Sequence, residues 1–339
     1  MRFYYRTINV RGRDLINTAI GNTPLRKCNF LSASYNSQIY IKDESHNPGK
    51  SSKDRAAWFM MEDAIRNEKI KPGGTFVEAS SGNTGISIAI LARKMGYRAK
   101  IFVSKTCSQE KLRILESYGA EVELCDNSRG MHIFNSTQYL AQAYAANTEN
   151  AYFTNQYYNS ANIKAHYKTT GPELWQQSEQ AVTHMLIGVG TGGSISGIGR
   201  FLKEQNRQIK IWGVEPVRSV YQGFVETGMV PEFQELHDAI EGIGRTFIPG
   251  AFDPQVVDRI FQVDAEESKD IAKQYYAQTN QLIGYSSAAV LACLEKYKEE
   301  MNLKEEDQLI LFFPDHGDRY IQKLYKEKKS QSSKIYNSL

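Results

Sequence analysis

The sequence has few cysteines and no long hydrophobic run. Its 339 residues include four cysteines, and none of them belongs to a Cys-x-x-Cys pair. Scattered cysteines are typical of free thiols in a reducing compartment, so we expect a cytoplasmic protein without disulfides. Apolar stretches such as residues 309–313 are far shorter than the ~20 residues that cross a bilayer. Residues 1–6 contain no apolar signal core, and we therefore expect no membrane association.

The sequence also lacks a strong net charge and metal-binding spacings. The formal net charge is +3, which is small for this length, and basic residues are not interleaved with aromatic ones. This composition argues against a nucleic-acid partner. The six histidines show no metal-ligand spacing, so we expect no metal site. Hydrophobic residues make up 41% and charged residues 23% of the chain, as in ordinary globular proteins with a buried core.

Helical and strand patterns alternate from about residue 40 to residue 314. Such alternation is typical of an α/β protein with largely parallel sheets. Expected strands cover residues 38–42, 75–78, 99–103, 121–124, 151–155, 185–187, 209–214, 257–263 and 308–313. One expected helix begins at Lys53, and four more cover residues 86–96, 106–119, 136–147 and 161–180. Another follows the 188–194 segment and ends at about Gln205, one begins at Glu266, and the last covers residues 286–300.

Two of these helices carry local signals. Thr106 and Gln109 have the spacing of a capping box, which predicts that a helix begins there. Gly171-Pro172 predicts a break in the helix over residues 161–180. Residues 216–255 are less regular, and we expect a functional or lid-like loop in this region.

Lys53 stands at the start of a predicted helix. Pro48-Gly49 interrupts the backbone before it, and Ser51 and Ser52 are good N-cap residues. The helix dipole disfavours a cation in the first turn, so the pKa of a lysine there is lowered. An amine with a lowered pKa can act as a nucleophile or as a base. The alternative from these residues alone is a solvated lysine at a helix end.

A glycine-rich segment, residues 188–194, follows a predicted strand and precedes a predicted helix. Its Gly188-x-Gly190-x-x-Gly193 spacing matches the dinucleotide fingerprint, and Glu215 ends the next strand, where such folds place the ribose-binding acid. This pattern indicates an NAD-dependent dehydrogenase. The hydroxyls and closely spaced glycines equally suit a cup of backbone N–H groups around one terminal phosphate. The residues of this loop leave both interpretations open.

The segment Ser80-Ser81-Gly82-Asn83-Thr84-Gly85 places hydroxyls, an amide and glycines at another predicted helix start. Such a loop can bind a carboxylate through N–H and O–H donors while the amide reaches a ring oxygen. The alternative is a turn with N-cap residues and no ligand.

Taken together, these segments resemble the cysteine synthase/cystathionine β-synthase family, which are fold type II enzymes dependent on pyridoxal 5'-phosphate (PLP). The likeness covers about residues 21–320. The motifs that carry it, in the family's order, are Gly21-Asn22-Thr23-Pro24-Leu25, Asn47-Pro48-Gly49 with Ser51, Lys53-Asp54-Arg55, Ser81-Gly82-Asn83-Thr84-Gly85, Asn155-Gln156, Thr169-Thr170-Gly171-Pro172-Glu173, the 188–194 segment, Gly242-Ile243-Gly244 and Gly284-Tyr285-Ser286-Ser287.

The resemblance implies a fold and a domain division. The fold would be α/β, with two three-layer αβα domains and mostly parallel sheets, similar to the tryptophan synthase β subunit. A smaller, mobile domain that binds the substrate carboxylate would cover residues 46–156. A larger PLP-binding domain would combine residues 12–45 with 157–326, and residues 327–339 would form a flexible tail. A homodimer is also implied.

The resemblance further implies roles for individual residues. Lys53 would form a Schiff base with PLP and remove the Cα proton of the substrate. Ser286 would contact the pyridine nitrogen, and its neutral hydroxyl would favour β-elimination to an aminoacrylate. Asn83 would bind the 3'-oxygen of the ring. The phosphate would be bound by Gly190, Thr191, Gly192, Gly193 and Ser194, and the substrate and its carboxylate by Ser80, Ser81, Thr84, Gln156 and Gly242.

Three basic residues bear on the choice of substrate. Lys50 stands where this motif usually has an uncharged residue. It could repel the charge of Lys53, face away into solvent, or attract an anionic substrate. Arg218 and Arg245 are further candidates for binding a leaving group or an anionic second substrate. Asp315 is expected to lie on the ring-nitrogen side.

The resulting expectation is a PLP-dependent β-replacement on an activated L-serine, either O-acetylserine or O-phosphoserine, through an aminoacrylate. Sulfide is the expected nucleophile, which makes cysteine synthase the leading hypothesis. An amino acid or another thiol could replace sulfide, as in N-(2-amino-2-carboxyethyl)-glutamate synthase or cystathionine β-synthase. Outside this class, the alternatives are an NAD-dependent dehydrogenase and an inactive PLP-binding homologue.

Overall fold

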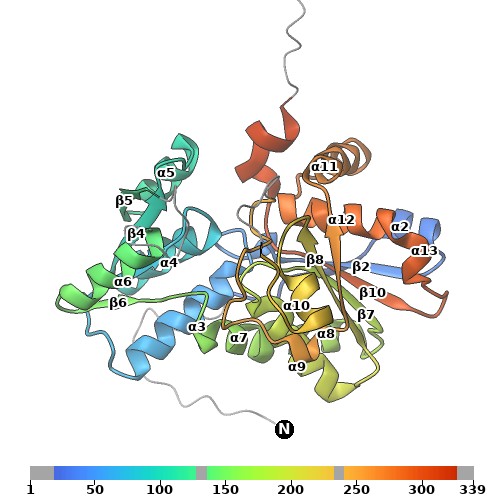
Figure 1. Cartoon of the computed structure of the whole chain (residues 1–339), viewed down its shortest axis with the longest axis horizontal. Helices are drawn as coiled ribbons and strands as arrows, with labels where there is room; N and C mark the ends of the chain where they lie inside the picture. Colours follow the sequence, from blue (N-terminus) through green and yellow to red (C-terminus); the bar gives the residue numbers. More distant parts are fainter. Residues whose placement is uncertain (1–18, 127–135, 233–239, 327–339) are drawn as a thin grey trace, which may run out of the picture.

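The computed structural model describes residues 19–126, 136–232 and 240–326 of the chain. Their strands form two sheets that lie side by side in Figure 1. The larger sheet has the order β1-β2-β10-β7-β8-β9, and the smaller has the order β5-β4-β3-β6. The strands are β1 (Leu25–Lys27), β2 (Gln38–Asp43), β3 (Thr75–Ala79), β4 (Arg98–Ser104), β5 (Glu121–Cys125), β6 (Ala151–Phe153), β7 (His184–Gly188), β8 (Lys210–Pro216), β9 (Arg259–Val263) and β10 (Gln308–Phe313).

Parallel pairing dominates both sheets, and β1 with β2 is the antiparallel exception among the described strands. Parallel neighbours need long crossover connections, which the helices provide. The helices are α2 (Asn29–Tyr35), α3 (Lys53–Arg66), α4 (Asn83–Met95), α5 (Gln109–Ser117), α6 (Thr137–Asn147), α7 (Ser160–Ala165), α8 (Gly171–Gln177), α9 (Gly193–Gln205), α10 (Tyr221–Thr227), α11 (Ala265–Thr279), α12 (Tyr285–Lys296) and α13 (Lys298–Met301).

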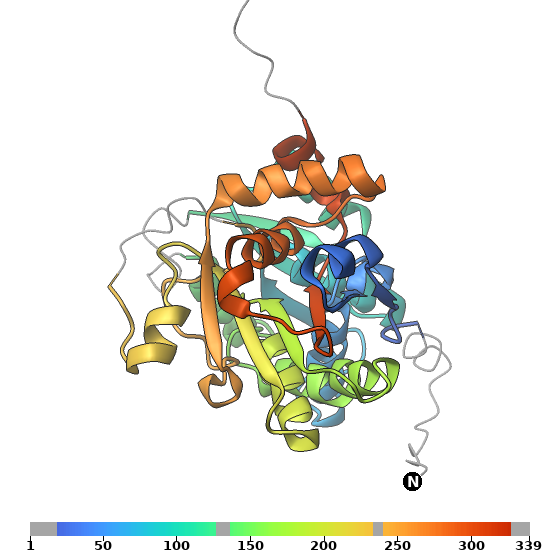
Figure 2. The ribbon, with the colours of Figure 1, turned by 90° about the vertical axis from the view of Figure 1, so that its right-hand side faces the viewer.

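Helices cover both faces of each sheet, so each sheet forms the middle of a three-layer αβα unit. One face of the larger sheet packs against α11 and α12, and the other packs against α8 and α9. Figure 2 shows the orange and the yellow-green helices on opposite sides of this sheet. In the smaller sheet, α3, α4 and α5 contribute to the core on one face, and α6 covers the other. The predicted α/β fold with two αβα units is therefore confirmed, whereas the exact domain boundaries stay a prediction.

Local details differ from the sequence prediction in two places. Helix α5 begins after Ser108, whose hydroxyl accepts the Lys111 N–H, so the capping box predicted at Thr106 is wrong. The predicted break at Gly171-Pro172 is also wrong. Pro172 occupies the first turn of α8, where its missing N–H costs no hydrogen bond, and the irregularity lies just before it, in a π-helical turn at His166–Thr170.

The loops that were singled out in the sequence follow the carboxyl ends of parallel strands. The 80–84 loop follows β3, the 188–194 loop follows β7, and Asp315 follows β10. In open α/β sheets, ligands bind at these strand ends. Over the three described ranges, no helix is long and apolar enough to cross a membrane.

Candidate active site

A buried ion network fixes the start of helix α3. The Arg55 guanidinium donates to Glu44 at 2.7 and 2.9 Å and to Glu173 at 2.6 and 2.7 Å. Lys42 donates to the same Glu173 carboxylate at 2.9 Å, and the Thr23 hydroxyl donates to Glu44 at 2.6 Å. Although burial alone would raise the pKa of Glu44, the charge of Arg55 holds it at about 2. Three sequence motifs that are far apart in the chain therefore meet immediately beside Lys53.

Lys53 is the first residue of α3, as predicted, and its amine faces the site. Among the described residues, no hydrogen bond or ion pair engages this amine, and the side chain lines both the pocket beside the 80–84 loop and the cavity of the glycine-rich loop. Burial, and then the positive charge of Arg245, lower the pKa of Lys53 to about 8, against the opposing effect of Asp315. The unprotonated fraction of the amine near neutral pH is therefore much larger than that of an ordinary lysine.

The glycine-rich loop lies at the N-terminus of α9, where backbone N–H groups lack intrahelical partners. Its glycines are required by close packing. A Cβ on Gly190 would lie 2.1 Å from the Gly242 carbonyl oxygen, and a Cβ on Gly193 would lie 2.1 Å from Asn162 Oδ1. Gly192 has φ +87°, which favours glycine. The loop thus presents backbone donors on a rigid support.

Two buried side chains orient the hydroxyls of this loop. Asn162 donates to Thr191 Oγ1 at 3.0 Å, and the Nε2 atom of His166 lies 3.0 Å from Ser194 Oγ. Burial, and then the charges of Lys53 and Arg55, lower the pKa of His166 to about 3, so the ring is neutral at physiological pH. Neither residue was predicted from the sequence, because an isolated Asn or His carries no signal of its contacts.

The 80–84 loop faces the same pocket, at the start of α4. Ser80, Ser81 and Thr84 line it together with Gln156, and the Thr84 hydroxyl donates to Gln156 Oε1 at 2.7 Å. The fully buried Glu78 accepts N–H groups on both sides, from Ala79 at 2.8 Å and from Gln156 at 3.2 Å. Burial raises the pKa of Glu78. This carboxyl joins the 80–84 loop to the segment that contains Gln156.

Asn83, Ser286 and Asp315 line the cavity beside Lys53. Asn83 donates to Asp315 Oδ2 at 2.8 Å and accepts a hydrogen bond from Arg319. Burial raises the pKa of Asp315, against hydrogen bonds from Tyr320 and Asn83. Its Oδ1 atom is buried and has no hydrogen-bond partner among the residues of the three described ranges. Asp315 thus lines the cavity with a carboxyl group whose pKa is raised and whose Oδ1 atom packs close to Gly284.

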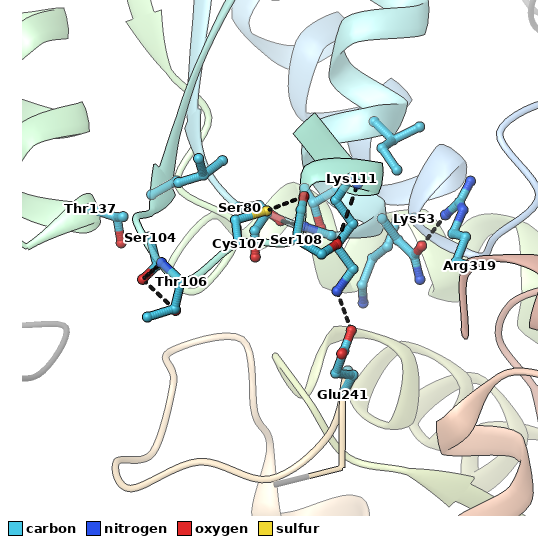
Figure 3. Close-up of a pocket in the computed structure, with 18 of the residues that line it drawn as sticks. Lys53, Ser80, Ser104, Thr106, Cys107, Ser108, Lys111, Thr137, Glu241 and Arg319 are labelled. Carbon is cyan, nitrogen blue, oxygen red and sulfur yellow. Dashed lines mark hydrogen bonds and ion pairs between the residues drawn. The ribbon is translucent and has the colours of Figure 1, made fainter. Parts of the chain in front are cut away.

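Charged residues that the sequence prediction missed close the pocket on the other side. Figure 3 shows Lys111, from α5, pointing across the pocket to Glu241, and these two side chains form an ion pair. Glu241 also pairs with Lys323 at 3.1 Å. The pair with Lys111 joins the part of the chain that carries the smaller sheet to the loop before Gly242. A contact between residues so far apart in the chain has no spacing pattern by which it could be predicted.

The three basic residues proposed for substrate selection lie in different places. Arg245 and Gly242 line the pocket together with Lys53. Lys50 and Arg218 are exposed and are not among the described residues that line it. Lys50 instead pairs with Asp318 at 2.6 Å, and its φ of 56° turns the backbone away from the helix that follows. We therefore assign Lys50 and Arg218 no part in the proposed site.

Glu215, the predicted ribose-binding acid of the dehydrogenase alternative, is buried and already occupied. It accepts the N–H groups of Tyr221 and Gln222, both at 2.9 Å, and the side-chain amide of Gln262 at 3.0 Å. The carboxylate thus caps the start of α10. This internal role removes the structural basis of the dinucleotide interpretation.

Comparisons with known proteins agree with the geometry. The family described as pyridoxal-phosphate dependent enzyme matches residues 16–315. A cysteine synthase of Staphylococcus aureus is 37% identical over 91% of this chain and 95% of its own length. The O-acetylserine dependent cystathionine β-synthase of Bacillus subtilis is 36% identical, over 91% of this chain and 96% of its own.

A cystathionine β-synthase of Apis mellifera is also 37% identical, over 92% of this chain, but the chain spans only 61% of the length of that protein. Among solved structures, O-ureido-L-serine synthase superposes with a TM-score of 0.82 at 27% identity, covering 93% of this chain and 96% of the other. The resemblance predicted from the sequence is therefore confirmed, and PLP is the cofactor of this family. The chain belongs to the pyridoxal-phosphate dependent enzymes, as a member of the group that contains the cysteine synthases and cystathionine β-synthases.

Proposed function

We propose that this enzyme catalyses β-replacement on an activated L-serine and, with sulfide as the nucleophile, forms L-cysteine. The proposal is carried by the position of Lys53, whose amine has no partner among the described residues and lies between a phosphate-type loop and a carboxylate-type loop. The names of the relatives, cysteine synthase and cystathionine β-synthase, support the reaction class. When bound, PLP acts as an electron sink that eases loss of the Cα proton and of the β-substituent.

The described residues fit this cofactor on two independent observations. The glycine-rich loop offers a helix N-terminus for its phosphate, as anion sites require. In the same cavity, Ser286 and Asp315, whose buried Oδ1 atom has no hydrogen-bond partner among the described residues, offer polar contacts for a heteroaromatic ring. In the proposal, Gly190, Thr191, Gly192, Gly193 and Ser194 hold the phosphate, and Asn83, Ser286 and Asp315 hold the ring.

The proposed tasks of the chain's own groups follow from their chemistry. Lys53 holds the cofactor and then takes the proton from the substrate Cα, which its lowered pKa favours. Ser80, Ser81, Thr84 and Gln156 bind the substrate carboxylate through hydroxyl, amide and backbone donors. Gly242 leaves room for the substrate beside Lys53. The pair between Lys111 and Glu241 limits access of water to the reacting atoms.

Lys53→Ala tests the assignment, with Lys69→Ala, an exposed lysine just beyond the end of helix α3, as the control. Purified wild-type protein should be yellow, and borohydride reduction should attach the cofactor to the peptide that contains Lys53. Lys53→Ala should lose this labelling and at least about 10³-fold in kcat for cysteine formation from O-acetylserine and sulfide, because both the anchor and the base are removed. Lys69→Ala should retain both. Labelling of another peptide, or full activity of Lys53→Ala, would refute the assignment.

A cytoplasmic location and a homodimer belong to the same proposal. All four cysteines are free thiols, and three of them are buried, as suits a reducing compartment. Sedimentation equilibrium of the holoenzyme at several concentrations measures the subunit number. A mass of one subunit at all concentrations would rule out the dimer.

A further inference from the structure

Arg245 is a cation of the pocket with no carboxylate partner among the described residues. Its side chain is half-buried, and within the described part of the chain it forms no ion pair. One terminal nitrogen donates to the carbonyl of Gly244 in its own loop, while the Nε atom is buried and has no hydrogen-bond partner in the ranges that the structure describes. A buried donor that lacks a partner is costly, and the cost is greater for a charged group. The site is therefore electrostatically incomplete at this position.

The other cations that line this pocket have partners. Lys111 and Lys323 share the Glu241 carboxylate, and Arg319 donates to the side chain of Asn83 and to the carbonyl of Gly49. In the proposed function, the Lys53 amine is bound to the cofactor. Apart from Lys53, Arg245 and Arg319 are thus the lining cations without an ion pair in the described part of the chain, and of these two Arg245 is the one with a buried nitrogen that lacks a hydrogen-bond partner there.

The guanidinium of Arg245 is held in place. Its carbon atom lies 5.2 Å from the centroid of the Tyr157 ring, within the range of a cation–π contact. Tyr157 in turn packs edge-on against Phe247 at 5.4 Å. The backbone N–H of Arg245 donates to Ser219 Oγ at 2.9 Å. A guanidinium fixed in this way can bind an oxyanion without first losing much side-chain entropy.

The location of Arg245 distinguishes between two potential partners, the phosphate of the cofactor and an anionic group of a substrate. Its Nη2 atom lies 3.6 Å from the place where a Cβ of Gly190 would be, so the cofactor phosphate is one potential partner. However, Arg245 lines the pocket of the 80–84 loop and is not among the described residues that line the cavity of the glycine-rich loop. Its charge also acts directly on Lys53. These relations favour the substrate side of Lys53.

We propose that Arg245 binds an oxyanion carried by a substrate beyond its Cβ atom, and so selects an anionic substrate over a neutral one. This inference rests on the proposed β-replacement. This oxyanion could be either of two groups, the phosphate leaving group of O-phospho-L-serine or the carboxylate of an incoming nucleophile. Arginine suits both, because its planar fork matches carboxylate and phosphate oxygens.

The test compares cofactor-saturated wild type, Arg245→Ala and Arg245→Lys in two arms. The first arm fixes sulfide and compares O-phospho-L-serine with O-acetyl-L-serine. The second arm fixes O-acetyl-L-serine and compares 3-mercaptopropionate with 3-mercapto-1-propanol, which differ in a carboxylate. The readout is the ratio of kcat/KM for the anionic over the neutral compound. Arg245→Ala should lower this ratio about tenfold to a hundredfold in the arm that contains the true source, and Arg245→Lys should lower it less.

Arg218→Asn is the matched control, because it removes an exposed arginine from the neighbouring loop and asparagine tolerates its φ of 64°. Its ratio should equal that of wild type. Ratios that change less than threefold in both arms for Arg245→Ala would overturn the inference, as would a loss of PLP affinity, measured by absorbance titration, without a change of ratio. If wild type forms product and the Arg245 variants keep the wild-type ratio of kcat/KM, this inference alone would be overturned. No product from wild type in either arm would overturn the proposed function and this inference with it.

Discussion

Replacing Arg55 with alanine should destabilise the protein strongly. The side chain is fully buried and donates four hydrogen bonds to two carboxylates, Glu44 and Glu173. Its removal leaves these carboxylates with Lys42 as their remaining ionic partner. Breaking one side of a buried ion pair typically costs about 3–5 kcal/mol. The lowering of the Glu44 pKa from 4.5 to about 2 gives a similar figure of about 3 kcal/mol.

The predicted loss depends on pH in a defined direction. The folded-state pKa of Glu44 lies below its unfolded value, so the stabilisation is complete above the unfolded pKa and is lost as the pH falls toward the folded one. In Arg55→Ala this contribution is absent at every pH. The difference in free energy of unfolding between wild type and variant should therefore be largest above about pH 5 and shrink as the pH falls toward 2.

Urea unfolding followed by circular dichroism, at several pH values, measures this difference. Arg66→Ala is the matched control, because Arg66 lies on the same helix and pairs with Glu62 at 2.6 Å but is 55% exposed. Exposed pairs on helices contribute only about 0.3–0.5 kcal/mol, so this variant should stay close to wild type. A loss below about 1 kcal/mol for Arg55→Ala, or a difference that does not shrink in acid, would refute the reasoning.

Three further substitutions test the site itself. Gly193→Ala should weaken PLP binding about tenfold or more, because the added Cβ would collide with Asn162. Absorbance titration measures the Kd, and an unchanged Kd would contradict the proposal that the glycine-rich loop binds the phosphate. His166→Ala should raise the same Kd about three- to tenfold through the loss of the bond to Ser194. Because the pKa of His166 is about 3, wild-type affinity should show no step from this ring between about pH 5 and 8. Glu241→Gln should make sulfate an approximately two- to fivefold stronger competitive inhibitor, since two lysines lose their counter-charge; equal inhibition constants would contradict this.

Much of the fold follows from sequence periodicity. The nine predicted strands correspond to β2–β10, and α4 ends at Gly96, which adopts the left-handed conformation expected of a helix-ending glycine. β1 and α2 were not predicted, because three strand residues and a helix without buried residues carry little periodic signal. The π-helical turn at His166–Thr170 was not predictable either, since a π-turn depends on packing and has no propensity pattern of its own.

The site divides in the same way. The positions of Lys53 and of the 80–84 and 188–194 loops at helix starts could be predicted, because each segment combines helix-start residues with side chains whose chemistry is local. The supporting side chains, such as Glu78, Asn162 and His166, could not. Their function consists of contacts with residues that are distant in the chain or turned inward by packing, and single-sequence patterns do not encode such contacts.

The basic residues show why charge in a sequence does not locate a binding site. Lys50 is nearest to Lys53 in sequence, yet the half-buried Asp318 pairs with its amine. Arg218 is exposed, so water screens its charge. Arg245 is farthest along the chain from Lys53, but the ring of Tyr157 and the loop after Gly242 hold it in the pocket, where no described residue forms an ion pair with it. Attraction for a ligand depends on an unscreened charge that no neighbour neutralises, and of these three residues Arg245 alone meets both conditions in the described structure.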